Sequence, residues 1–230
     1  MNKVNKLISI VVPVFNESES IKLLIDEICN VMEIHKLKFE LIIINDGSLD
    51  NTINVLENLS LKINQLTVVN LRKNYGQTAA LAAGFDNSNG EVIVTLDGDL
   101  QNDPRDIPKL ITNLNEGYDL ICGWRFQRQD KLLNRRIPSK IANRLIGNVT
   151  GIHLHDYGCS LKAFKREIIN DIKLYGELHR FLPVLANIEG AKIKEIKVNH
   201  RSRKYGYSKY GIDRTFRVLM DLLTVWFMNK

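Results

Sequence analysis

The chain has 230 residues, of which 44% are hydrophobic and 25% are charged. These values are ordinary for a globular protein and exclude a low-complexity chain. No apolar run reaches the about 18 residues that a membrane-spanning helix needs, and the N-terminus enters a strand pattern without the features of a signal peptide. The 32 basic and 26 acidic side chains leave a net charge of +6. That excess indicates anionic partners such as phosphates, acidic lipid or nucleic acid.

The cysteines and the layout of the chain set further limits. Cys29, Cys122 and Cys159 are far apart and lack C-x-x-C spacing, so we expect reduced, mostly buried thiols in a cytosolic setting. No internal repeat, low-complexity tract or linker is visible. We therefore expect one domain over residues 1–210, followed by a terminal helix over residues 211–230.

Strand and helix patterns alternate through the first half of the chain. Short apolar runs rich in β-branched residues predict strands, and apolar residues at helical spacing predict amphipathic helices. The predicted strands are 7–14, 39–44, 66–71, 92–96 and 119–122, and the predicted helices lie near 17–32, 53–59, 78–85 and 105–115. Asn16 is expected to cap the first helix, with Glu19 as its capping-box partner. The alternation predicts an α/β fold with a doubly wound, mostly parallel sheet flanked by helices.

The alternation stops after Gly123. A basic segment leads from there into a predicted helix that ends near Val149; its cations are Arg125, Arg128, Lys131, Arg135, Arg136, Lys140 and Arg144. Such a run is commonly a solvated face, but its position after a strand end favours a mobile basic loop over a site. Further strands are predicted at 158–164 and 191–198, antiparallel at the sheet edge, with a helix near 181–189 between them.

The last segment, from Gly211 to Met228, is predicted to be an amphipathic helix. Its polar residues form one narrow stripe, and the remaining positions are largely apolar, including Trp226 and Phe227. One interpretation is a helix docked on the core. The other is a helix that lies in a membrane interface, where a broad apolar face and tryptophan are favoured.

A pair of carboxylates follows the fourth predicted strand. Asp97 and Asp99 are two residues apart, and Gln101 comes just beyond them. If the strand geometry continues, both carboxylates point to one face at the carboxyl end of a strand, where open α/β sheets bind ligands. Adjacent carboxylates repel one another unless a cation lies between them, and a hard ion such as Mg²⁺ or Mn²⁺ suits these donors. The alternative is a polar strand-to-helix loop in which Asp103 caps a helix opened by Pro104.

Seven short motifs occur in order along the chain. They are VVPVFNE at 11–17, NDGSLDNT at 45–52, LRKNYGQTAAL at 71–81, LDGDLQNDP at 96–104, HDYGCSLKAF at 155–164, HRFLP at 179–183 and HRSRKYGYSKYG at 200–211. With these motifs the chain resembles the family 2 glycosyltransferases of the GT-A fold, from about Ile8 to its end. Within that family it is similar to the polyprenyl-phosphate sugar transferases, the group of dolichol-phosphate mannose synthase.

The resemblance implies a pocket for a nucleoside-diphosphate sugar. The implied residues are Pro13, Phe15, Glu17, Asp46, Arg72, Asn74, Asp97, Gly98, Arg203 and Lys209. Phe15 would contact the base, Glu17 the ribose hydroxyls, and Asp46 an N–H group of the base. Many members carry a second aspartate at position 45, where this chain has Asn45. The two basic residues before the last helix would neutralise the phosphates, arginine as a bidentate clamp and lysine as a point charge.

The resemblance also implies metal-binding and catalytic residues. Asp99 and Gln101 would ligate Mg²⁺ or Mn²⁺, which bridges the diphosphate, and Asp97 would reach the donor sugar or the surroundings of the metal. The candidate catalytic residues are Asp156, Asp97 and Arg125, and the candidates for the acceptor phosphate are Arg125 and Arg135. Asp156 matches the position of a candidate base in inverting members. A phosphate monoester, with a second pKa of about 6, is mostly a dianion at neutral pH, so Asp156 is expected to orient the acceptor or a basic side chain.

These features predict an inverting, metal-dependent transfer of a hexose from GDP-mannose or a UDP-hexose to a polyprenyl phosphate. The enzyme would act as a peripheral protein at the cytoplasmic face of the membrane. The sequence allows either a monomer or a homo-oligomer. One alternative is a soluble metal-dependent glycosyltransferase with a sugar or protein acceptor; a processive polysaccharide synthase is disfavoured because its Q-x-x-R-W element and spanning helices are missing. A non-enzymatic binder of anionic polymers or nucleic acid leaves the carboxylate loop unexplained. No nucleic-acid partner is expected, because no recognition signature is present.

Overall fold

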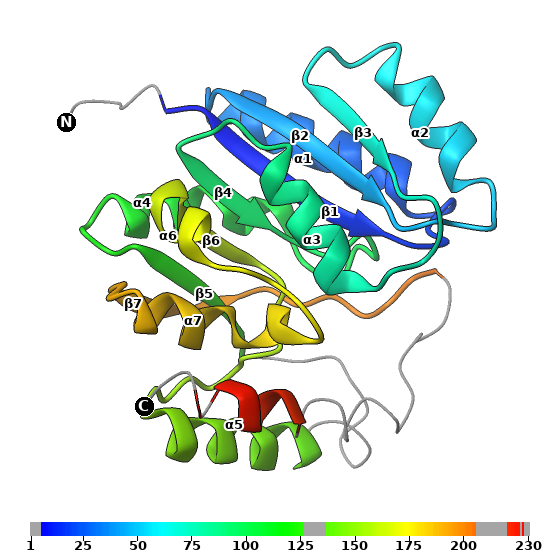
Figure 1. Cartoon of the computed structure of the whole chain (residues 1–230). Helices are drawn as coiled ribbons and strands as arrows, with labels where there is room; N and C mark the ends of the chain where they lie inside the picture. The colour runs from blue at the N-terminus through cyan, green and yellow to red at the C-terminus, as the bar shows by residue number, and fades with distance from the viewer. Residues whose placement is uncertain (1–5, 127–136, 206–219, 226, 228–230) are drawn as a thin grey trace.

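The computed structural model describes residues 6–126, 137–205, 220–225 and 227, and Figure 1 shows their arrangement around one sheet. The strands are β1 (Ile8–Val14), β2 (Phe39–Asn45), β3 (Leu66–Asn70), β4 (Val92–Thr95), β5 (Leu120–Arg125), β6 (Lys162–Lys165) and β7 (Ile193–Val198). The helices are α1 (Ile21–Ile34), α2 (Thr52–Ser60), α3 (Gln77–Asp86), η1 (Pro104–Asp106), α4 (Ile107–Leu114), α5 (Ile137–Thr150), α6 (Arg166–Asp171), η3 (Leu178–Phe181) and α7 (Leu182–Ile188). Each strand and helix predicted before residue 123 is present. α6 was not predicted.

In the described part of the chain, the strands form one seven-stranded sheet in the order β3-β2-β1-β4-β6-β5-β7. β1 pairs in parallel with β2 and β4, β2 pairs with β3, and β5 pairs with β7. The predicted doubly wound, mostly parallel sheet is therefore confirmed. The carboxyl ends of all strands except β6 lie along one edge, which is where open α/β sheets bind ligands.

The prediction for the last two strands is partly wrong. β6 is antiparallel to both neighbours, as predicted, but it lies inside the sheet between β4 and β5. β7 lies at the edge and runs parallel to β5. β6 has four residues, and Lys162, Ala163 and Phe164 are buried. Buried backbone N–H and C=O groups need hydrogen-bond partners. Inside the sheet, β6 finds them on both sides, in β4 and β5.

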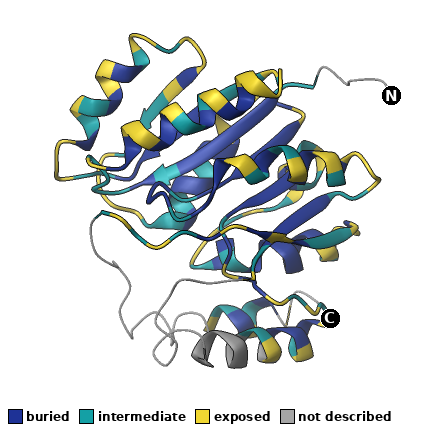
Figure 2. Ribbon diagram, turned by 180° about the vertical axis from the view of Figure 1, so that it is seen from behind, coloured by how far each residue is buried: buried dark blue, intermediate teal, exposed yellow. Residues whose placement is uncertain are grey.

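Helices cover both faces of the sheet, and β1 shows the division. Ile10 and Val12 belong to the apolar cluster formed with α1, α2 and α4, whereas Val11 belongs to the cluster formed with α3, α6 and α7. This alternation follows from the period of two in a strand. Figure 2 shows the buried strands enclosed between helices whose outer faces are exposed. The strands whose carboxyl ends form the ligand-binding edge are therefore packed between two apolar clusters, one on each face of the sheet.

The start of α1 corrects the predicted capping box. The helix begins at Ile21 after Ser20, and Asn16 does not cap it. Asn16 has a φ of 51°, and its Oδ1 accepts a hydrogen bond from the Leu49 N–H at 2.7 Å. Its own N–H donates to Ser48 Oγ at 2.9 Å. Contacts with the loop after β2 therefore decide where this helix starts, and the local capping pattern is overridden.

The described turn of the terminal segment packs partly on the core. Leu222 and Val225 are buried in a cluster with residues of α5, η3 and α7. Phe227 is 71% exposed, and Leu223 is also exposed; Trp226 lies outside the described residues. This turn thus has a docked side and an exposed apolar side. Within the described ranges, no helix is long and apolar enough to cross a bilayer.

The three cysteines are free thiols, as predicted. Cys122 and Cys159 are buried, and Cys29 is half-buried. Burial raises the pKa of Cys122 to about 12 and that of Cys159 to about 11. These two thiols are therefore protonated and unreactive at neutral pH.

Candidate active site

The carboxylate loop leaves the sheet at the end of β4. The strand ends before Asp97, so the two carboxylates stand in the following loop and not on the strand itself. The backbone turns at Leu100, whose φ of 62° lies in the left-handed region. Asp97 Oδ1 accepts a hydrogen bond from Gln77 Nε2 at 2.8 Å, and Asp99 Oδ1 accepts one from the Gln101 N–H at 3.0 Å. The loop therefore fixes each carboxylate through a separate contact.

Asp99 has a strongly perturbed environment. It is 7% exposed, and burial raises its pKa to about 6, with the charge of Asp97 adding to the rise. Arg203 opposes the rise: its Nη2 donates to Asp99 Oδ2, and its Nη1 lies 4.0 Å from Glu17 Oε1. The single positive charge of Arg203 does not balance the negative charges of Asp97, Asp99 and Glu17. The described residues thus leave negative charge that a divalent cation would neutralise.

The donor set fits a hard divalent cation whose coordination is completed by substrate. Among the described residues, no three His, Cys, Asp or Glu side chains converge as a metal site made by protein alone. Asp99 and Gln101 stand together on the loop, and Mg²⁺ is commonly held by one or two carboxylates with waters and substrate phosphates. Asp99 Oδ2 is bonded to Arg203. A cation at that oxygen would take the place of the guanidinium.

Asp46 stands directly after β2 and organises the neighbouring loop. Its two oxygens accept hydrogen bonds from the Tyr75 N–H at 2.7 Å and the Gly76 N–H at 2.9 Å. Burial raises its pKa, although both N–H donors oppose the rise. Gly47 has a φ of 65°, and a Cβ atom there would lie 2.4 Å from the carbonyl carbon of Lys73. Asp46 therefore holds the loop after β3 close against the end of β2, in addition to any contact with a base.

The structure brings most of the predicted site residues to one edge. The residues at the carboxyl ends of β1, β2 and β4 are Pro13, Phe15, Glu17, Asp46, Asp97, Gly98, Asp99 and Gln101. Arg203 comes from the segment after β7 and contacts Glu17 and Asp99. Ser20 lies between two of them: its Oγ is 2.8 Å from Glu17 Oε2 and 3.0 Å from the Gly98 carbonyl oxygen, and its one O–H can donate to either. Arg72 and Asn74 are exposed on the loop after β3. Lys209 and Arg135 lie outside the described residues.

Asp156 and Arg125 form a buried ion pair at the end of β5. Arg125 Nε donates to Asp156 Oδ2 at 2.6 Å and Nη2 to Oδ1 at 2.8 Å, and the side chains are 15% and 3% exposed. Burial by itself lowers the pKa of Arg125, but the hydrogen bonds and charge of Asp156 outweigh it and hold that pKa above its ordinary value. Two guanidinium nitrogens are thus committed to Asp156, which limits how Arg125 can also grip an acceptor phosphate.

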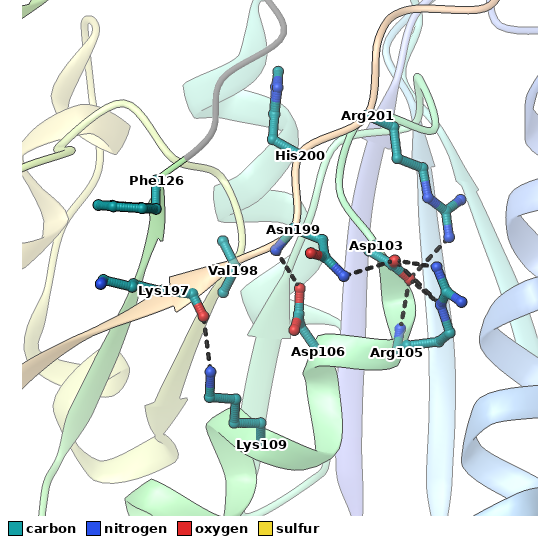
Figure 3. Close-up of a pocket in the computed structure, with 10 residues that line it drawn as sticks. All are labelled: Asp103, Arg105, Asp106, Lys109, Phe126, Lys197, Val198, Asn199, His200 and Arg201. Atoms are coloured by element: carbon teal, nitrogen blue, oxygen red, sulfur yellow. Dashed lines mark hydrogen bonds and ion pairs between the residues drawn. The ribbon is translucent and has the colours of Figure 1, made fainter.

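The segment after β7 contains Arg201, a residue of the motif at 200–211 to which the sequence assigned no role. Figure 3 shows Asp103 bonded to both Arg105 and Arg201. These three residues help to line a pocket of about 490 Å³. Burial alone would raise the pKa of Asp103, but the bonds from Arg105 and the charge of Arg201 lower it. Asp103 also accepts the Arg105 N–H at 3.1 Å, which confirms its predicted cap on η1. Because the Arg201 N–H donates to the Gln101 carbonyl at 2.9 Å, this segment is tied to the carboxylate loop two residues before Arg203.

The seven-stranded sheet and its flanking helices have the GT-A fold. A crystal structure of glucosyl-3-phosphoglycerate synthase from Mycobacterium tuberculosis, with Mn²⁺ and UDP-glucose, matches the fold with a TM-score of 0.73 at 18% identity, over 97% of this chain and 79% of that one. Residues 9–173 match the family model "Glycosyl transferase family 2". The chain belongs to that family and is a glycosyltransferase.

Two characterised relatives are more similar in sequence. Dodecaprenyl-phosphate galacturonate synthase from Rhizobium johnstonii is 47% identical over 227 residues, which cover 97% of this chain and 67% of that protein. Undecaprenyl-phosphate 4-deoxy-4-formamido-L-arabinose transferase from Proteus mirabilis is 40% identical over 223 residues, covering 96% and 68%. Both alignments extend well beyond the residues that the family model matches.

Proposed function

We propose that this chain transfers a hexose or hexose derivative from a nucleoside-diphosphate sugar to a polyprenyl phosphate, with inversion at the anomeric carbon. The observation that carries the proposal is the environment of Asp99: a buried carboxylate under excess negative charge, covered by Arg203, at the carboxyl edge of the sheet. Such a site suits a cation bridged to a diphosphate. The acceptor class is supported by the names of the two relatives, which both act on polyprenyl phosphates.

The donor is a UDP-sugar in this proposal, with GDP-mannose as the alternative. The related fold that binds UDP-glucose supports uridine. Phe15 and Glu17 follow β1, and Asp46 follows β2, so they lie where the base and ribose would enter the edge. Asp46 would then act both on the base and on the loop whose N–H groups it already accepts.

The proposed cofactor is Mg²⁺ or Mn²⁺, held by Asp99 and Gln101. When bound, the ion stabilises the negative charge that develops on the leaving nucleoside diphosphate. Arg203, released from Asp99, would contact the same diphosphate, because an arginine fork suits phosphate oxygens. Asp97, fixed by Gln77, would contact the donor sugar. These residues position the donor so that the acceptor phosphate attacks in line.

Asp156 is proposed to orient the acceptor and not to remove its proton. The acceptor phosphate is largely a dianion at neutral pH, so it needs positioning and charge neutralisation. Asp156 holds Arg125 by two hydrogen bonds. This leaves Arg125 a fixed cation at the end of β5, where its remaining edge can face the acceptor.

The enzyme is proposed to act peripherally at the cytoplasmic face of a membrane, where its lipid acceptor resides. The exposed Leu223 and Phe227 of the terminal helix support an interfacial contact. The other side of that helix is docked through Leu222 and Val225, so we propose a helix that is both docked and interfacial. The division into a catalytic domain over 1–210 and an interfacial helix over 211–230 stays a prediction.

A two-stage experiment tests this function. A thermal-shift screen of UDP-, GDP- and dTDP-sugars with Mg²⁺ or Mn²⁺ would identify the donor by a metal-dependent rise in melting temperature. Transfer of the labelled sugar to a polyprenyl phosphate, compared with free sugars and peptides, would then identify the acceptor. Transfer to the free sugars or peptides alone would contradict the proposal, as would full turnover in excess EDTA.

A further inference from the structure

Glu195 is a buried carboxylate that no sequence motif singled out. It lies on β7 opposite Cys122 of β5, and its side chain is 10% exposed. Its Oε1 accepts the Asp156 N–H at 2.9 Å, and its Oε2 accepts both the His155 N–H at 3.0 Å and His155 Nδ1 at 2.7 Å. A single side chain therefore binds the backbone at Asp156 and at the residue before it.

A second buried charge holds the other end of the same turn. Lys162 of β6 is 3% exposed. Its Nζ donates to the Tyr157 carbonyl at 3.5 Å and also to the Cys159 carbonyl. The turn from 155 to 161 is thus held by a carboxylate at its N–H groups and by an ammonium at its carbonyl groups. The negative charge of Glu195 thus faces the positive ends of the N–H dipoles, and the positive charge of Lys162 faces the negative ends of the carbonyl dipoles.

The turn connects the ion pair with the carboxylate loop. Ser160 Oγ donates to Asn102 Oδ1 at 2.7 Å, and the Asp97 N–H donates to the same oxygen at 3.2 Å. The Ser160 carbonyl also accepts Thr95 Oγ1 at 2.7 Å, at the end of β4. A displacement of the turn would therefore change the distance between Asp156 and the loop that carries Asp97.

We infer that Glu195 is a positioning residue for the reaction: it holds the 155–161 turn so that the Asp156–Arg125 pair keeps its place relative to the donor site. This inference rests on the proposed function. Glu195 acts through the turn, because its carboxylate is bonded to two N–H groups of the turn and to the ring of His155. Displacement of a reacting group by about 1 Å lowers rates by about 100-fold, so loosening the turn should lower kcat far more than it changes donor binding.

The first test is hydrogen exchange in Glu195→Gln, which needs no turnover. The amide oxygen of glutamine can replace one carboxylate oxygen but not both, so the His155 or the Asp156 N–H loses its acceptor. We expect faster exchange confined to the amides of the turn. Glu116→Gln is the matched control, because Glu116 pairs with Lys194, the neighbouring residue of β7, at 3.1 Å and does not contact the turn. Unchanged exchange at the turn would overturn the inference, as would an increase spread over the whole sheet.

The second test is a double-mutant cycle with Asp156→Asn. Glu195→Gln should lower kcat about 10-fold, and no more than Asp156→Asn does, while the KM for the sugar nucleotide stays within about two-fold. In the Asp156→Asn background the same change should have little further effect, because Glu195 acts through that residue. Two losses that simply multiply would show a merely structural role and overturn the inference. If Glu195→Gln does not fold, Glu195→Asp, which keeps the charge but shortens its reach, serves in both tests.

These two tests also separate this inference from the proposed function. If no polyprenyl phosphate is glycosylated by the wild-type chain, the proposed function fails. The exchange result then decides by itself whether Glu195 holds the turn. If transfer occurs and the cycle is additive, the function stands and the positioning role is refuted.

Discussion

Substitution of Asp99 by asparagine should make the metal-free protein more stable while abolishing transfer. An acid whose pKa is raised in the folded state destabilises that state when it is ionised. Burial and the neighbouring Asp97 raise the pKa of Asp99 from 3.8 to about 6. That rise corresponds to about 3 kcal/mol of destabilisation, complete above pH about 6 and absent below the unfolded value of 3.8. The pKa of about 6 already includes the opposing attraction of Arg203, so the figure is a net one.

The assay is thermal unfolding in EDTA from pH 4 to pH 8. For a chain of this size each kcal/mol shifts the melting temperature by about 2–4 °C, so at pH 8 the Asn variant should melt about 6–12 °C above the wild type. The difference should vanish near pH 4. With excess Mn²⁺ and a nucleoside diphosphate the order should reverse, because only the wild type has the charged metal ligand. Binding of the bare nucleoside should change little.

Asp26→Asn is the matched control, because Asp26 is an exposed aspartate of α1 that pairs with Lys22 on the helix surface. It should change neither the pH profile nor transfer. An Asp99→Asn protein that melts below the wild type in EDTA at pH 8 would refute the electrostatic reasoning. It would mean that the pair with Arg203 outweighs the cost of burying the charge.

Three further predictions concern the acceptor side, the nucleotide loop and the membrane contact. Asp156→Asn should keep substantial activity that rises little above pH 7, because the acceptor is already ionised; a rate that climbs steeply with pH at intact donor binding would identify a general base. Gly47→Ala should lower the melting temperature and weaken nucleoside binding in calorimetry, because its φ of 65° and the 2.4 Å approach to Lys73 exclude a Cβ; unchanged affinity would exclude this loop from the nucleotide pocket. Trp226→Asp with Phe227→Asp should remove the salt-resistant part of liposome co-sedimentation and leave sugar-nucleotide binding intact; a large fall in melting temperature with unchanged co-sedimentation would mean that the helix serves the core alone.

Local patterns in the sequence were enough to predict the strands, the helices and the sheet edge where the candidate site lies. The apolar runs of β1, β2 and β4 and the helical spacing in α1 and α4 are local patterns, and hydrophobic burial acts on them wherever the strands finally lie. The carboxylates of Asp97 and Asp99 could be placed at a strand end for the same reason. Parallel strands joined by helices bring their carboxyl ends to one edge, so residues after β1, β2 and β4 had to meet there.

The partners of the charged side chains and the order of the last strands could not be predicted before the chain was folded. Arg203 meets Asp99, and Arg125 meets Asp156, across separations of 104 and 31 residues. No local pattern encodes such pairs, because an ion pair depends on which backbones become neighbours. The same holds for β6, whose short buried run gives no sign that it separates β4 from β5. Glu195 was overlooked because one glutamate in an alternating strand is typical of a solvated position, and the backbone N–H groups that it accepts are invisible until the chain has folded.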